Sequence, residues 1–282
     1  MGRIESRVPA ADYFARPGLS ISRLKEMRRS PLHYQHALAN PKTTAAMTLG
    51  TAAHCATLEP ERFGRDYAVW ARRTESGRLA PRNGKAWDAF VAEAGGRDVL
   101  TEEECSLALA IGTAVRRDPV AGKYLVSGEP EVTMEWELAG GRACKGRVDW
   151  LTHMDDGPVL VGLKTARECR HFAFATAAAK LGYHLQWGWY ADGWHIIKGT
   201  VPRVVEIVVE SAPPHAVVVY DIGEDVLAVG RDEYQELLRL LDECERRNEW
   251  RGPAQTELVF TLPKWVTGGD ENLTDLDLEI ET

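Results

Sequence analysis

The pattern of apolar and polar positions along the chain changes its period near residue 131. In the first part, apolar residues recur at helical spacing. Ser30-Pro31 marks one helix start, and Thr101 followed by Glu104 has the spacing of a capping box. An arginine- and glycine-rich stretch at 72–84 predicts a loop. We therefore expect a mainly helical region. One helix, capped by Ser20 or Ser22, carries Leu24 and Met27, a second begins at Ser30-Pro31, and further helices lie near 47–58, 85–94 and 101–117.

Beyond residue 131, apolar and polar residues alternate, as in a half-buried strand. Val132, Met134 and Trp136 lie on one side of that strand, and Gly140-Gly141 predicts a hairpin turn. The run 158–164 is short and apolar, which is typical of a central strand. The expected fold class is α/β, a mixed sheet flanked by helices, with strands at 131–137, 142–151, 158–164, 204–209 and 216–220 and helices at 173–197 and 226–247.

This pattern predicts one domain over residues 1–265, followed by an acidic tail at 266–282. Within the domain we expect a mainly helical part (1–130), a sheet core that carries the active site (131–222) and a C-terminal helix (223–250). At 282 residues, with 44% hydrophobic and 27% charged positions, the composition is that of an ordinary globular protein.

The formal net charge of −8 argues against nucleic-acid binding only if the charges are evenly spread. They are not, because the first 42 residues carry eight Lys or Arg against three acids, whereas the last thirteen hold six acids and no base. A phosphate-binding cleft is thus compatible with the overall charge. The five cysteines form no C-x-x-C pair, and there is neither a membrane-length apolar run nor a signal-peptide pattern, so we expect a cytoplasmic location and no membrane association.

The candidate chemistry lies between residues 144 and 166. Side chains two apart on a strand share a face, so Arg147 lies beside Asp149, and position 162 lies beside Lys164. If the two strands are neighbours, Asp149 and Lys164 come together. Phosphodiester hydrolysis requires a hard cation on oxygen ligands and a positive charge near the nucleophile, and an acid followed by acid-x-lysine supplies both. Here the middle acid is replaced by Gly162.

Five segments in order resemble the PDDEXK nuclease superfamily, and more closely its RecE-like branch of exonuclease VIII-type phage and prophage proteins. The resemblance extends over most of the chain. The segments are Leu19-Ser20-Ile21-Ser22 with Ser30-Pro31 and Tyr34, Gly50-Thr51-Ala52-Ala53-His54, Gly146-Arg147-Val148-Asp149, Leu163-Lys164-Thr165, and Tyr183-His184-Leu185-Gln186 with Tyr190.

The resemblance implies a restriction-endonuclease-like core with a helical N-terminal elaboration, and a divalent metal, Mg²⁺ or Mn²⁺. His54 and Asp149 would bind the metal, the Leu163 carbonyl would complete its shell, and Lys164 would position water or stabilise charge. Gln186 and Tyr190, which share a helical face, would lie beside the cleft with Tyr183. Arg147 is a further candidate for substrate binding, and Glu131 is similar to an acid near the site in some relatives.

Gly162 departs from the family, which normally carries an acid at this position. The chain could be a natural variant that binds DNA but cleaves slowly, or a form inactivated to trap a complex. Alternatively, a carboxylate from elsewhere could fill the gap, with Glu131 or Glu168 preferred over Asp155 and Asp156, which are expected in a turn. We favour a weakened or inactive site.

The resulting prediction is an ATP-independent exonuclease that resects linear double-stranded DNA from a 5′ end for recombination. The resemblance implies a homo-oligomeric ring and a single-strand annealing recombinase as partner. No phosphate-binding loop of the G-x-x-x-x-G-K-[ST] kind is present. We expect phosphate contacts from the basic N-terminal helices and from four arginines of the 72–84 loop, Arg72, Arg73, Arg78 and Arg82.

Two other functions compete with this prediction. The first is a non-catalytic DNA-binding or assembly protein on a nuclease fold, for which Gly162 is the main evidence. The second is a phage regulatory protein that uses its acidic tail to contact a partner or to mimic DNA. Each candidate residue also has a purely structural interpretation: His54 could be a hydrogen-bonded core residue, and the tryptophans at 187, 189 and 194 are expected to pack.

Overall fold

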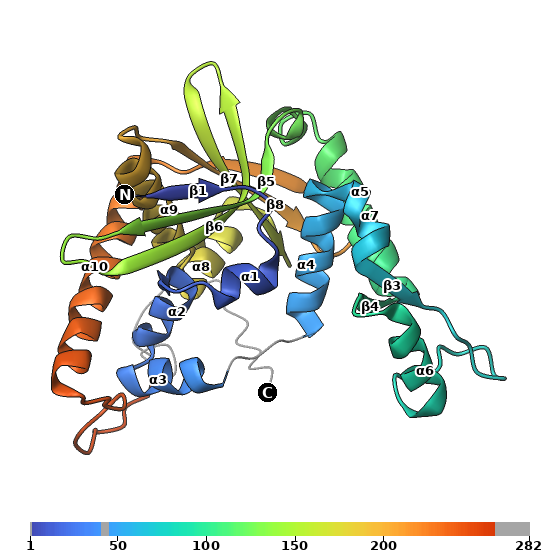
Figure 1. Cartoon of the computed structure of the whole chain (residues 1–282), viewed down its shortest axis with the longest axis horizontal. Helices are drawn as coiled ribbons and strands as arrows, with labels where there is room; N and C mark the ends of the chain where they lie inside the picture. Colours follow the sequence, from blue (N-terminus) through green and yellow to red (C-terminus); the bar gives the residue numbers. More distant parts are fainter. Residues whose placement is uncertain (1, 41–44, 263–282) are drawn as a thin grey trace.

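The computed structural model describes residues 2–40 and 45–262, and its centre is a seven-stranded sheet (Figure 1). The order is β1-β5-β6-β7-β8-β9, and a short β2 also pairs with β6. Neighbours are antiparallel except for β7 with β8 and β2 with β6. The strands are β1 (Arg3–Glu5), β2 (Leu19–Ser20), β5 (Glu129–Glu137), β6 (Ala143–Met154), β7 (Gly157–Ala166), β8 (Arg203–Glu210) and β9 (Val217–Asp221). The predicted mixed sheet is confirmed.

Helices cover both faces of this sheet, as predicted. They are α1 (Ala10–Ala15), α2 (Ile21–Leu24), α3 (Pro31–Ala39), α4 (Ala45–Leu58), α5 (Pro60–Asp66), α6 (Gly84–Ala94), α7 (Glu102–Arg117), α8 (His171–Leu181), α9 (Tyr183–Lys198) and α10 (Glu224–Arg247), with 3₁₀ turns η1 (Lys25–Arg28) and η2 (Gly122–Leu125). Figure 1 shows α4 and α7 on one side of the sheet and α9 with α10 on the other.

The apolar strand β7 explains why the sheet is buried on both faces. Val159, Val161 and Leu163 pack in the cluster that contains residues of α4 and α7. Leu160 packs in the cluster of α9 and α10. Because side chains alternate along a strand, Gly162 and Lys164 share the face of Leu160. The active-site candidates of β7 therefore point toward the α9 side.

Two helix starts follow the sequence signals closely. The Ser30 side chain accepts a hydrogen bond from the His33 backbone amide, with Pro31 in the first turn of α3. At the start of α7, Thr101 accepts from the Glu104 amide, and the Glu104 carboxylate accepts from the Thr101 amide. This is the predicted capping box.

The single helix expected at 173–197 is wrong, because α8 ends at Leu181 and α9 begins at Tyr183. Gly182 between them adopts a left-handed conformation with φ of 65°, which favours glycine and ends a helix. The break matters for the site, since of these two helices only α9 carries residues that line it. Strand β6 is also longer than predicted and continues to Met154.

Several elements were not predicted. A separate two-stranded parallel sheet, β3 (Tyr67–Trp70) with β4 (Asp98–Thr101), lies between α5 and α7 in the sequence. At the N-terminus, β1 pairs with β5 and β2 pairs with β6. Beside β2, the buried Lys145 ammonium donates to the backbone carbonyls of Tyr13 at 2.8 Å and Arg16 at 2.6 Å, which fixes the end of α1 on the sheet.

The crossing of α9 and α10 is unusually close because it is built on glycine. A Cβ atom built at Gly230 would stand 2.5 Å from the His184 carbonyl carbon and closer still to its oxygen. One at Gly188 would stand 3.1 Å from backbone atoms of Leu227 and Arg231. The two backbones thus touch where side chains would normally separate them.

Across the described residues, no helix is long and apolar enough to cross a membrane. The predicted acidic tail lies outside the described residues.

Candidate active site at the divergence of two strands

Asp149 lies where β6 and β7 separate. The pairing of the two strands runs from Met154 opposite Gly157 to Trp150 opposite Val161 and goes no further. One residue beyond, the Asp149 carboxylate accepts a hydrogen bond from the Leu163 backbone amide at 2.8 Å. This hydrogen bond to a side chain replaces the next backbone hydrogen bond of the strand pair. It directs the Asp149 carboxylate into the gap between the strands.

Lys164 lies between two carboxylates. Its ammonium is 3.5 Å from the Asp149 Oδ2 atom and 3.5 Å from the Glu206 Oε1 atom. It also donates to the Leu163 carbonyl at 3.3 Å. The predicted meeting of Asp149 and Lys164 is therefore present in the structure, and a second acid joins them.

Glu206 was not considered in the sequence analysis. It lies in the middle of β8, is only 1% exposed, and its Oε2 atom accepts from the Trp187 indole at 2.5 Å. Its Oε1 atom accepts no hydrogen bond in the described part of the structure. The available signal was a lone acid in the run Val204–Val209, where an isolated buried charge would be costly.

His54 reaches the same site from α4. Its Nδ1 atom is 3.8 Å from the Asp149 Oδ1 atom. Burial lowers the pKa of His54 below its usual value. The ring is therefore neutral at neutral pH, the form in which imidazole binds metals.

The charges of the cluster are set by mutual contact. Burial alone would raise the pKa of Asp149, but Lys164 and His54 outweigh it and hold the pKa below its usual value. Burial opposes the charge of Lys164 as well, but Glu206 and Asp149 raise its pKa far above the usual range. Burial raises the pKa of Glu206. Lys164 is consequently a fixed cation at neutral pH, and Asp149 a fixed anion.

Helix α9 covers the site on the sheet face that carries Gly162 and Lys164. Gln186 donates to the Tyr190 hydroxyl at 3.0 Å, and the Lys164 ammonium lies 5.5 Å from the centre of the Tyr183 ring. A cavity of about 10 Å³ remains among these groups, about the room that one water molecule needs. Its lining includes the predicted residues Asp149, Gly162, Lys164, Gln186 and Tyr190, together with Glu206.

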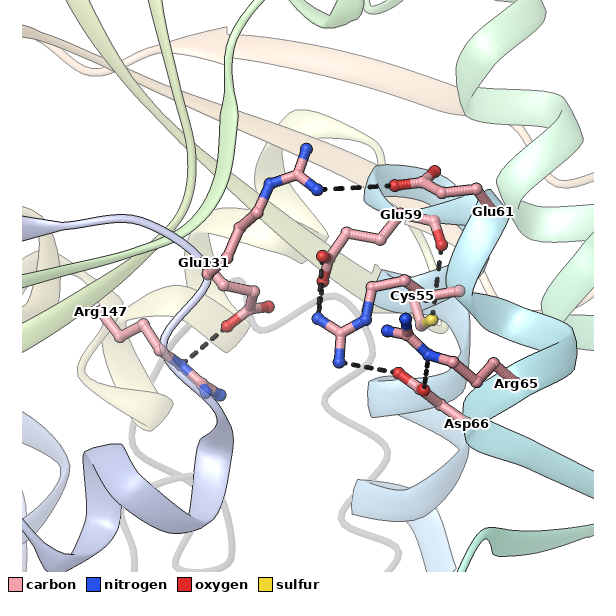
Figure 2. A network of polar contacts seen from close by, with 9 residues as sticks. Cys55, Glu59, Glu61, Arg65, Asp66, Glu131 and Arg147 are labelled. Carbon is pink, nitrogen blue, oxygen red and sulfur yellow. Dashed lines mark hydrogen bonds and ion pairs between the residues drawn. The ribbon is translucent and has the colours of Figure 1, made fainter.

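Glu131 and Arg147 form a pair of their own. The Arg147 guanidinium lies 2.7 Å from the Glu131 carboxylate (Figure 2). It also lies over the Tyr13 ring, 5.2 Å from its centre. Burial raises the pKa of Glu131 to about 7, although Arg147 acts in the opposite direction. Glu131 is thus engaged with Arg147 instead of the cavity.

The other acids weighed for the gap at Gly162 are also engaged elsewhere. Glu168 pairs with Arg170 at the surface. Asp155 and Asp156 form the turn between β6 and β7, as predicted, and Asp156 pairs with Arg203. None of these three lines the cavity.

The arginine-rich loop lies outside the cluster around Asp149 and Lys164. Its four arginines (Arg72, Arg73, Arg78 and Arg82) are exposed, and Figure 1 shows the loop, between β3 and α6, extending away from the main sheet. Arg73 pairs with Glu102, and Arg82 pairs with Glu104. Any contact from this loop to a bound nucleic acid would be made at a distance from Asp149.

The donors in and beside the cavity fit a hard divalent cation. The carboxylates of Asp149 and Glu206 line the cavity, and the Glu206 Oε1 atom is buried without a hydrogen-bond donor in the described structure. The Leu163 carbonyl and neutral His54 lie outside this lining, beside Lys164 and Asp149, and are suitable further ligands. Among the described residues, no three His, Cys, Asp or Glu side chains are already gathered as a complete metal site. Instead, Lys164 stands between the two acids.

A mixed sheet whose two central strands diverge at an acid and a lysine, with helices on both faces, defines a protein with the fold of PDDEXK-type nucleases. Residues 20–258 match the family described as "PDDEXK-like domain of unknown function (DUF3799)". The chain belongs to this family. No curated protein matches it.

Among solved structures, the chain is similar to a protein of Eubacterium rectale described as a "putative exonuclease", with a TM-score of 0.61 and 14% identity over 94% of this chain and 100% of the other. A Vibrio cholerae protein, VC1899, gives a TM-score of 0.25 at 12% identity, over 86% of this chain and 58% of the other. At such identities the first likeness concerns the fold alone.

Proposed function

We propose that the protein is a metal-dependent DNA nuclease that degrades linear duplex DNA from its ends. The observation that carries the proposal is the buried contact between Asp149 and Lys164 at the divergence of β6 and β7, with His54 beside them. A divalent ion bound there would polarise a phosphodiester and activate water. The family membership and the fold likeness support a nuclease, and the RecE-like motifs support action on DNA ends.

The protein's own residues have separate tasks in this proposal. Asp149, Leu163 and His54 would hold the ion. The Lys164 ammonium, charged at neutral pH, would orient the attacking water or stabilise the negative charge that develops on the phosphate. Gln186 and Tyr190, held to each other on α9, would limit how the scissile phosphate enters.

The test uses linear and circular duplexes of one sequence, labelled at the 5′ or the 3′ end, with Mg²⁺ or Mn²⁺. We expect degradation of the linear form only, release of the 5′ label first, and no degradation after Lys164→Ala or addition of EDTA. Cutting of the circle would indicate an endonuclease. Unchanged activity of the Lys164→Ala variant would overturn the site assignment.

The alternative function is a DNA-binding or assembly protein without catalysis. Gly162 supports it, because one acid of the usual motif is missing. Duplex binding without cleavage by the unaltered protein, under all metal conditions, would favour this alternative. The annealing partner, the ring and the phage origin are further proposals that rest on the resemblance alone, and light scattering would test the ring.

A further inference from the structure

The missing acid at position 162 has a counterpart on the neighbouring strand. In the parallel pairing of β7 with β8, Gly162 is the register partner of Glu206. A Cβ atom built at Gly162 would stand 2.5 Å from both carboxylate oxygens of Glu206. The Glu206 carboxylate therefore occupies the space that a side chain at position 162 would need.

We propose that Glu206 replaces the missing acid and is the second carboxylate ligand of the metal site, so that the site is competent despite Gly162. This inference rests on the proposed nuclease function and deepens it. The carboxylate comes from the adjacent strand, yet it lies in the space that a side chain at position 162 would need.

The contacts of Glu206 agree with a ligand role. The Trp187 indole holds one carboxylate oxygen, which fixes the orientation of the group. The other oxygen, Oε1, lies 3.5 Å from the Lys164 ammonium and lacks a hydrogen-bond donor in the described structure. Lys164 is equally distant from Asp149, so the two acids flank the lysine as the two acids of the usual motif would be expected to do.

A purely structural role explains these features less well. A glutamate among valines and isoleucines is costly to bury, and a neutral or apolar side chain would fill the same space without that cost. Glycine in a strand interior also weakens the strand. The two unfavourable residues are register partners, and the glycine leaves the room that the Glu206 carboxylate occupies.

The experiment compares the unaltered protein with Glu206→Gln, Gly162→Asp and the exchange variant Gly162→Asp/Glu206→Ala. The control is Glu210→Gln, the same substitution four residues along β8 and outside the cavity. Two quantities are measured for each: Mn²⁺ affinity by calorimetry without DNA, and degradation of linear duplex. Circular dichroism checks that each variant is folded.

We expect Glu206→Gln to lower Mn²⁺ affinity at least 10-fold and activity at least 100-fold, whereas Glu210→Gln changes neither by more than about 2-fold. The amide introduced by Glu206→Gln would still accept the Trp187 hydrogen bond, so the loss would report on the charge. Gly162→Asp alone should lose activity, because two carboxylates would compete for one space. The exchange variant should recover at least 10-fold in both measurements relative to Glu206→Gln.

Other outcomes separate this inference from the proposed function. If the unaltered protein cuts DNA and Glu206→Gln cuts equally well, Glu206 is not a ligand, but the nuclease function stands. If Gly162→Asp gains activity that the unaltered protein lacks, the glycine disables the site and the inference is wrong. If no variant binds Mn²⁺ or cuts DNA, the proposed function fails and this inference fails with it.

Discussion

Substitution of Gly230 by alanine should destabilise the protein, although alanine is the better helix former. Gly230 lies inside α10, where the exchange would normally gain about 1 kcal/mol. Here the new Cβ atom would stand 2.5 Å from the His184 carbonyl carbon, and the obstacle is backbone, which cannot rotate away. Overpacking of this kind costs roughly 3 kcal/mol at the upper end of its usual range. We expect a net loss of about 2 kcal/mol in the free energy of unfolding.

The assay is urea unfolding at pH 7.5, followed by tryptophan fluorescence and circular dichroism. The matched control is Gly50→Ala in α4, because a Cβ atom there would meet nothing within 4 Å. The control should gain up to about 1 kcal/mol from helix propensity alone. If Gly230→Ala gains as much as Gly50→Ala, the close approach of α9 to α10 is not what the structure indicates.

The other predictions concern lysines and the arginine loop. Lys145→Met should lower the free energy of unfolding in urea by about 2 kcal/mol or more, because the backbone carbonyls of Tyr13 and Arg16 lose their hydrogen-bond donor. An unchanged free energy of unfolding would mean that these carbonyls accept hydrogen bonds from another donor in the variant. Burial and the nearby Lys164 lower the pKa of Lys25 to about 8, so its unfavourable charge is relieved as the pH rises from 8 toward 10.5. The unaltered protein should therefore gain stability relative to Lys25→Met across that range, and parallel curves would contradict the lowered pKa. Replacement of the four loop arginines by alanine should weaken duplex binding and flatten its salt dependence. The four residues are Arg72, Arg73, Arg78 and Arg82. An unchanged affinity with an unchanged salt slope would exclude the loop from DNA binding.

The fold could be predicted well wherever the sequence period is strong. The alternation around Val132 and the apolar run before Lys164 located the central strands, and the Thr101 capping box located the start of α7. The break at Gly182 was missed, because glycines at 188 and 193 do occur inside α9 and composition alone does not distinguish them. Only the folded structure distinguishes them. Gly188 and Gly193 are helical and lie against neighbouring elements, whereas Gly182 has a positive φ that ends the helix.

The candidate site was predicted in part for a related reason. Motif spacing along the chain brought Asp149 and Lys164 to attention, and His54 lies beside them. Glu206 follows Lys164 by 42 positions and belongs to no local motif. Its relation to Gly162 exists only through the register of β7 with β8, and strand register cannot be inferred reliably from one apolar strand to the next.

The short strand β2 has a consequence for the order of events during synthesis. Leu19 pairs with Cys144, and the buried ammonium of Lys145 holds the end of α1, so the first twenty residues have their partners about 125 positions later. At the usual rate of translation this corresponds to a wait of roughly 6 to 25 s. During that time Leu19 and the α1 carbonyls cannot reach their final contacts. The first twenty residues, which carry three arginines against two acids, therefore complete their contacts only after much of the sheet has been synthesised.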